Sequence, residues 1–173
     1  MNPPKLKKKI CLLGSFGVGK TSLVQRFVYN RFSEDYLSTI GVRVAQKDVS
    51  TADKHPTLRM LIWDIEGIEA GNPVVKNYYT GAAAAIVVGD VTRPDTFSQI
   101  PRLIQRFSAI NPQAVFVLAA NKSDLLPDLQ STEKAMKSIA GEIGSDFYLT
   151  SAKDGSNVQE IFNYLYDKLI ENV

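Results

Sequence analysis

The sequence predicts a single α/β domain built on a doubly wound sheet. Short apolar segments alternate with helical patterns along the chain, and two of these segments, residues 84–90 and 115–120, are almost continuously apolar. Uninterrupted apolar runs are typical of parallel strands that helices cover on both faces. The length of 173 residues suits one domain with a substantial core, and no internal repeat or linker divides it.

Six segments are expected to form the sheet. They lie at residues 9–13, 42–50, 57–64, 84–90, 115–120 and 147–150. The short polar turn at residues 51–56 predicts that the second and third strands form an antiparallel hairpin. The expected sheet is therefore six-stranded and mostly parallel, with one antiparallel edge and helices on both faces.

The connecting helices are expected at residues 20–30, 73–80, 95–110, 131–144 and 156–171. In the third of them, apolar residues recur at helical spacing after Pro94, which stands where a helix begins. Ser156 or Asn157 is expected to cap the last helix. Together the elements define one domain over residues 9–171, after a basic N-terminal tail of residues 1–8.

The bulk properties exclude several classes of function. The net charge is only +2, so nucleic acid is not predicted as a partner, and the group Lys5, Lys7, Lys8 and Lys9 is interpreted as a solvated tail. Cys11 is the only cysteine, which excludes an internal disulfide and fits a reducing compartment. No apolar run is long enough to span a bilayer. A cytoplasmic protein with no transmembrane segment is therefore expected.

Residues 14–21 match the phosphate-binding motif G-x-x-x-x-G-K-[ST] between a predicted strand and a predicted helix. Its glycines let successive backbone N–H groups point inward and form a nest for phosphate oxygens at a helix N-terminus. Lys20 is expected to reach the β- and γ-phosphates, and the Thr21 hydroxyl to bind Mg²⁺. The residues assigned to this P-loop are Gly14, Ser15, Phe16, Gly17, Val18, Gly19, Lys20 and Thr21.

Three more loops follow predicted strands, at the edge where ligands of such sheets bind. After the third strand, Asp64 can hold Mg²⁺ through water, and Gly67 can bring its N–H to a γ-phosphate. In N-K-S-D after the fifth strand, Asp124 can accept the N1–H and amino donors of guanine, which adenine does not offer. After the sixth strand, the Ala152 N–H can donate to guanine O6. These loops predict guanine as the base.

With these motifs in order, the chain resembles small GTPases of the Ras superfamily over about residues 9–171, a single P-loop G domain. The stretch T-I-G-V at residues 39–42 most resembles the Rab branch. The resemblance implies a molecular switch that binds GTP or GDP with Mg²⁺. It places Phe32 against the guanine and Tyr36 where switch I folds over the phosphates. Beyond the P-loop, the implied nucleotide-binding residues are Ser22, Phe32, Tyr36, Thr39, Gly67, Asn121, Lys122, Asp124, Ser151, Ala152 and Lys153.

The resemblance also implies the metal site and the catalytic residues. Thr21 and Thr39 would ligate Mg²⁺, with Thr39 doing so only when GTP is bound, and Asp64 would support the metal through water. Lys20 would neutralise phosphate charge. Catalysis is assigned to Lys20, Thr39 and Gly67.

Switch II departs from the family pattern, which usually reads D-T-A-G-Q. Ile68 replaces the glutamine that orients the attacking water, and an isoleucine side chain has no donor or acceptor for that task. Glu66 replaces a small alanine, and the sequence leaves three alternatives open: it repels GTP, replaces the missing water ligand, or points outward. Phe16 is bulky where many relatives have a small residue, and it can hinder an arginine finger that a partner supplies.

Two functional classes remain open after these departures. The first is a GTP/GDP switch with slow or partner-dependent hydrolysis, because the phosphate, metal and base residues are intact. The second is a guanine-nucleotide-binding scaffold with negligible hydrolysis, because Ile68, Glu66 and Phe16 depart from the pattern. The stretch at residues 121–124 disfavours a kinase or ATPase.

The resemblance implies that effector, exchange-factor and activating proteins bind through switch I and switch II. Arg43, Trp63 and Tyr78 are candidate contacts. The chain stops just after its last predicted helix without a C-terminal cysteine, so no lipidation site is expected in it. The protein is expected to be peripheral at membranes only if a missing tail or a partner anchors it.

Overall fold

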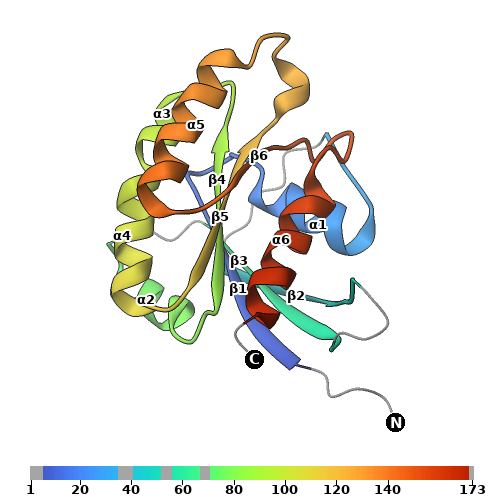
Figure 1. The fold of residues 1–173 in the computed structure, drawn as a ribbon, viewed down its shortest axis with the longest axis vertical. Helices are drawn as coiled ribbons and strands as arrows, with labels where there is room; N and C mark the ends of the chain where they lie inside the picture. The colour runs from blue at the N-terminus through green and yellow to red at the C-terminus, as the bar shows by residue number, and fades with distance from the viewer. Residues whose placement is uncertain (1–5, 35–40, 52–55, 67–70, 172–173) are drawn as a thin grey trace.

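A computed structural model describes residues 6–34, 41–51, 56–66 and 71–171 (Figure 1). Within these residues six strands form one sheet in the order β2-β3-β1-β4-β5-β6, and only the β2–β3 pair is antiparallel. The strands are β1 (Leu6–Leu13), β2 (Gly41–Val49), β3 (Leu58–Glu66), β4 (Ala84–Asp90), β5 (Val115–Asn121) and β6 (Phe147–Leu149). The predicted fold class is confirmed.

Helices cover both faces of this sheet, with α1 and α6 on one side and α2 to α5 on the other (Figure 1). The helices are α1 (Lys20–Tyr29), α2 (Pro73–Tyr79), α3 (Asp95–Ser98), α4 (Ile100–Ile110), α5 (Gln130–Ile143) and α6 (Val158–Ile170), and a 3₁₀ turn, η1, spans Ser123–Leu125. The two faces form two hydrophobic clusters. Phe27 and Phe162 stack at 3.5 Å between α1 and α6, while Phe107 of α4 packs on the opposite face.

Several element boundaries differ from those predicted. Strand β1 begins at Leu6, because residues 6–8 pair with residues 58–60 of β3, so the basic tail is shorter than expected. The predicted helix at 95–110 is two helices, since Pro101 cannot donate a backbone hydrogen bond and stands in the first turn of α4. Strand β3 continues to Glu66, which was predicted to lie in a loop.

The start of α6 also differs in its mechanism from the predicted cap. Asn157 does precede the helix, but it lies in the left-handed region at φ 55° and its side chain makes no cap hydrogen bond. Its amide nitrogen donates instead to the Leu149 carbonyl over 2.8 Å. Asn157 therefore fastens the start of α6 to the end of β6.

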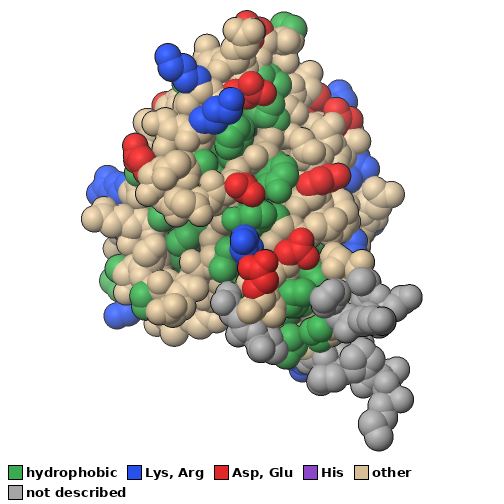
Figure 2. All heavy atoms as spheres, in the orientation of Figure 1, with side chains coloured by type: hydrophobic (Ala, Val, Ile, Leu, Met, Phe, Trp, Pro, Cys, Tyr) green, Lys and Arg blue, Asp and Glu red, His purple; other side chains and the backbone are tan. Residues whose placement is uncertain are grey.

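On the face seen in Figure 2, basic and acidic side chains are interspersed, and no single large basic area is visible. Such mixed charge is typical of globular domains. No helix in the described ranges has the length and apolar character required to cross a bilayer.

The order of the strands in the sheet indicates which end of the sheet can bind a ligand. From β1 the chain builds β2 and β3 on one side, whereas β4, β5 and β6 extend on the other. Connections that leave neighbouring parallel strands towards opposite faces create a crevice beyond their carboxyl ends. The P-loop, Glu66 and Asn121 all follow or end strands at that edge.

Candidate functional site

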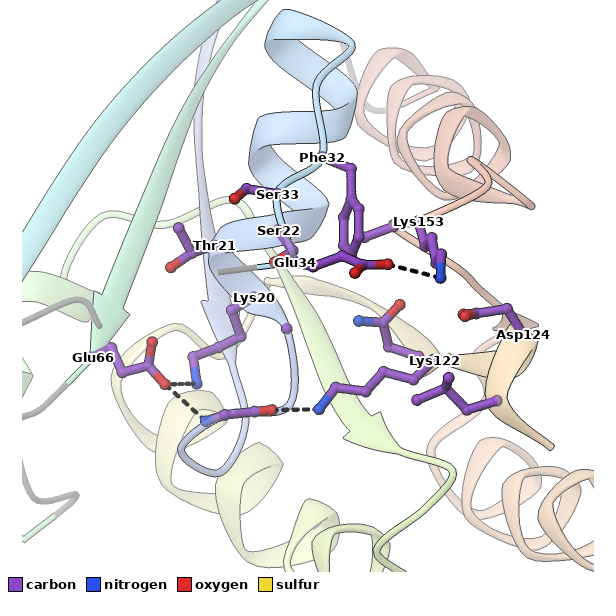
Figure 3. Close-up of a pocket in the computed structure, with 15 residues that line it drawn as sticks. Lys20, Thr21, Ser22, Phe32, Ser33, Glu34, Glu66, Lys122, Asp124 and Lys153 are labelled. Atoms are coloured by element: carbon purple, nitrogen blue, oxygen red, sulfur yellow. Dashed lines mark hydrogen bonds and ion pairs between the residues drawn. The ribbon is translucent and has the colours of Figure 1, made fainter. Parts of the chain in front are cut away.

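A pocket of about 290 Å³ lies at this edge and brings together residues from five separate stretches of the chain (Figure 3). Most of the predicted nucleotide-binding positions that the structure describes contribute to it or contact a residue that does. The pocket is lined by Gly17, Gly19, Lys20, Thr21, Ser22, Phe32, Ser33, Glu34, Glu66, Asn121, Lys122, Asp124, Leu125, Ala152 and Lys153.

The P-loop owes its shape to glycine. Gly19 has φ +100°, and a Cβ there would lie 2.3 Å from Nδ2 of Asn121. Gly14 is equally constrained, because a Cβ would lie 2.4 Å from the Val88 carbonyl oxygen. Helix α1 starts directly after Gly19 without a side-chain cap, and the N-terminus of a helix favours an anion.

Lys20 lies at the centre of this loop and is only 2% exposed. Its ammonium donates to the carbonyl oxygens of Gly14 and Ser15 over 2.9 Å and 3.0 Å, and it lies 3.4 Å from Oε1 of Glu66. Burial lowers the pKa of Lys20, while the carboxylates of Glu66 and Asp64 oppose that shift. A buried cation in a nest of N–H groups makes this a strong anion site.

The predicted metal-binding pair is in contact. The Thr21 hydroxyl donates to Asp64 Oδ2 over 2.5 Å, and both side chains are buried. Asp64 Oδ1 is also buried and has no hydrogen-bond partner among the described residues. Burial raises the pKa of Asp64, although Thr21 and Lys20 oppose the shift.

This donor set fits a hydrated Mg²⁺. Mg²⁺ binds through one or two protein oxygens and keeps several waters, which the unpaired Asp64 oxygen can accept. No cluster of three His, Cys, Asp or Glu side chains occurs in the described ranges. Phosphate oxygens and water would supply further ligands, and the predicted ligand Thr39 lies outside the described residues.

The other end of the pocket carries the residues predicted to recognise the base. The Asp124 carboxylate accepts a hydrogen bond from the Ser151 hydroxyl over 2.7 Å, which fixes its orientation. Phe32 is at the pocket wall and is 36% exposed. Lys153 lies close by and forms an ion pair of 2.9 Å with Glu34 (Figure 3). A carboxylate beside apolar surfaces suits a planar ring that offers two N–H donors.

Comparison with known proteins agrees with this geometry. The model of the Ras family matches residues 9–171. The chain belongs to the Ras family of small GTPases. It is 42% identical to the Ras-related protein RABF2b of Arabidopsis thaliana over 91% of this chain and 78% of the relative.

Other relatives carry Rab names as well. The Ras-related protein Rab5A of Oryza sativa is 38% identical, over 94% of this chain and 80% of the relative. The Ras-related protein Rab-22A of Canis lupus familiaris is 38% identical, over 89% and 79% respectively. These relatives support membership of the Rab branch, whose members are GTP-binding regulatory switches.

Two residues of the guanine motif in this Ras-family chain join loops together. The Asn121 amide donates to the Val18 carbonyl over 3.0 Å and accepts from Thr150 over 3.1 Å. The Lys122 ammonium donates to the Gly17 carbonyl over 2.9 Å. Both side chains therefore tie the P-loop to the end of β5.

Sequence reasoning missed several residues that support this small GTPase site. Asp90 Oδ2 lies 2.7 Å from the Lys122 ammonium, and Arg93 donates to the Phe16 carbonyl over 2.8 Å. Arg26 of α1 donates to the carbonyls of Ala152 and Lys153, which positions the third loop. Asp90 had one signal, its place at the end of an apolar strand; the arginines had none.

The remaining predicted P-loop residues do not line the pocket. Val18 is fully buried in the core beneath the loop, and the Ser15 hydroxyl donates to Gln99 over 2.9 Å. The Phe16 side chain is 55% exposed on the rim. The predictions for Tyr36, Thr39, Gly67 and Ile68 lie outside the described residues.

The position of the Glu66 side chain excludes one of the three alternatives that the sequence left open. Its side chain is only 8% exposed, and Oε1 accepts a hydrogen bond from the Gly17 N–H over 3.1 Å. The alternative in which Glu66 points outward is therefore wrong. Its carboxylate lies within the P-loop of this Ras-family protein (Figure 3).

Proposed function

We propose that the chain is a GTP/GDP-binding molecular switch whose GTP hydrolysis is slow or depends on a partner. The observation that carries this proposal is one pocket with a buried cation, Lys20, at one end and an oriented carboxylate, Asp124, at the other. A cation and N–H nest suit phosphates, and the carboxylate suits guanine.

Each end has a separate task. Lys20 and the P-loop amides hold phosphate oxygens and offset their charge, while Thr21 and Asp64 would hold Mg²⁺ and its waters. Mg²⁺, when bound, supplies charge neutralisation between the phosphates. Asp124, supported by Ser151, orients the base, so that the phosphates enter the loop in one register.

We propose that partner proteins bind the surface formed by the N-terminal part of β2 and by α2. Val44 is 54% exposed on β2, and the preceding residue Arg43 is also exposed. Val74 is 44% exposed on α2. Trp63 and Tyr78 are half-buried with ring centroids 6.5 Å apart. Effector, exchange-factor and activating proteins would bind here together with switch I.

The slow-hydrolysis part of the proposal rests on Ile68. Phosphoryl transfer depends on placing the attacking water in line, and isoleucine cannot hydrogen-bond it. Single-turnover hydrolysis with protein in excess over GTP tests this directly. We expect a low rate for the wild type and a higher one for Ile68→Gln, with GTP alone as the baseline.

A second candidate function is a guanine-nucleotide-binding scaffold with negligible hydrolysis. The Glu66 carboxylate within the P-loop favours it, because a fixed anion there opposes a triphosphate. A wild-type rate equal to that of GTP alone, with and without candidate activating proteins, would select the scaffold. No gain from Ile68→Gln would assign the block to Glu66 or Phe16.

A further inference from the structure

The Glu66 carboxylate uses the donors that a P-loop offers to phosphate. Its Oε1 accepts from the Gly17 N–H over 3.1 Å and lies 3.4 Å from the Lys20 ammonium (Figure 3). Glu66 is 8% exposed and Lys20 2% exposed, so water screens this pair weakly. An internal anion therefore shares two of the loop's donors.

The position of Glu66 follows from the geometry of strand β3. Side chains two residues apart on a strand point to the same face, so Glu66 lies on the face of Asp64. Asp64 already contacts Thr21 of α1 from that face. Two residues further along the strand, the Glu66 side chain, with its two methylene groups, reaches from β3 to the Gly17 N–H.

Lys20 has no donor to spare in this arrangement. An ammonium group has three N–H donors. The carbonyl oxygens of Gly14 and Ser15 and the Glu66 carboxylate supply three acceptors within 3.4 Å. A phosphate oxygen that reaches Lys20 must displace at least one of them, and the carboxylate is the one that carries charge.

We propose that Glu66 occupies the terminal-phosphate end of the P-loop and competes with the γ-phosphate, so that the protein discriminates against GTP relative to GDP. The inference rests on the proposed nucleotide site. The lysine of such a loop reaches the β- and γ-phosphates. GDP ends at the β-phosphate and competes for fewer of these donors. GTP brings a further negative charge towards both Glu66 and Asp64.

Three substitutions separate contact from general charge. Glu66→Gln removes the charge at constant shape, and Glu66→Ala removes the side chain beyond Cβ. Glu66→Asp keeps the charge but shortens the reach by one methylene. Glu142→Gln, an exposed carboxylate on α5, is the control for net charge.

The measurement is calorimetric affinity for GDP and for a non-hydrolysable GTP analogue with an imido bridge between the β- and γ-phosphorus atoms, in Mg²⁺. We expect Glu66→Gln and Glu66→Ala to lower the ratio of the GTP-analogue Kd to the GDP Kd by about tenfold or more. Glu142→Gln should leave the ratio unchanged. Glu66→Asp should move the ratio towards that of Glu66→Gln.

Each other outcome has a definite reading. An unchanged ratio in Glu66→Gln and Glu66→Ala would overturn the inference while GDP binding upheld the proposed function. If Glu66→Asp kept the wild-type ratio of Kd values, the effect would come from through-space repulsion and not from direct contact, which would also overturn the inference. If the wild type bound neither nucleotide but Glu66→Gln bound the GTP analogue, the inference would stand and the proposed switch would fall. Binding by none of the folded variants would remove both.

Discussion

The Thr21 hydroxyl donates to Asp64 Oδ2 over 2.5 Å, and this bond joins helix α1 to strand β3 beside the P-loop. The second oxygen of the same carboxylate is buried without a hydrogen-bond partner among the described residues. A buried, unpaired carboxylate oxygen is costly unless a ligand or water satisfies it. The pair therefore suits a hydrated cation.

Substitution of Asp64 by Asn should weaken magnesium-dependent nucleotide binding. The change removes the charge that supports the waters of Mg²⁺, so we expect GDP affinity in Mg²⁺ to fall about 10- to 100-fold. Thr21→Ser keeps the hydroxyl and serves as the control. GDP titrations of the wild type and the variant, with and without excess EDTA, test this prediction. An equal loss of GDP affinity in both conditions would contradict the metal role of Asp64.

Asp124→Asn should change the preferred base. Xanthine has a carbonyl where guanine has an amino group, so an asparagine amide can donate where the aspartate accepted. We expect the preference for guanosine over xanthosine diphosphate to fall by about 100-fold or more. Asp128→Asn, which removes an exposed carboxylate before α5, should keep the wild-type preference. Unchanged base preference in Asp124→Asn would refute the assignment.

Asp90 should contribute to stability in a pH-dependent way. Burial opposes its charge, but hydrogen bonds from Lys122 and Thr92 outweigh it and hold the pKa of Asp90 below its ordinary value of 3.8. Since the folded pKa is the lower one, the contribution is present above pH 3.8 and is lost as the pH falls through the folded pKa.

Urea unfolding of the wild type and Asp90→Asn measures that contribution. We expect Asp90→Asn to cost on the order of 1–3 kcal/mol at neutral pH, because Lys122 and Arg93 lose a charged acceptor. The difference in unfolding free energy should shrink as the pH falls towards 3. A difference that stays constant over this range would show that the carboxylate charge contributes nothing.

Cys11 should be unreactive in the folded protein. It is fully buried in β1, and burial raises the pKa of its thiol from 9.0 to about 12, although Lys9 opposes the shift. Because the thiolate is the nucleophile, iodoacetamide labelling at pH 8 should be slower than in urea by about 1000-fold. Mass spectrometry of labelled samples gives both rates; similar rates would mean that β1 opens readily.

Local patterns predicted most of the fold, because strands β4 and β5 have strong signals of their own. The P-loop was equally predictable, since strand, glycines, Lys20 and Thr21 stand within one stretch. Contacts between residues far apart in the sequence could not be predicted from local patterns. Lys122 meets Gly17, 105 residues away, and Asp90 only because β1, β4 and β5 lie side by side.

The position of Glu66 shows the same limit more sharply. The sequence placed Glu66 in a loop, where its side chain has no defined direction. Its pairing with Gly41 extends β3 and thereby fixes the face to which it points. A shift of two residues in a predicted strand end thus decided whether a carboxylate enters the P-loop.

The most direct measurement is calorimetry of well-folded, nucleotide-stripped protein with GDP and with ADP in Mg²⁺. Both ligands carry two phosphates, so the comparison isolates recognition of the base. The account predicts that GDP binds tighter than ADP by about 1000-fold or more. The absence of heat with GDP, or equal affinities for the two nucleotides, would contradict it.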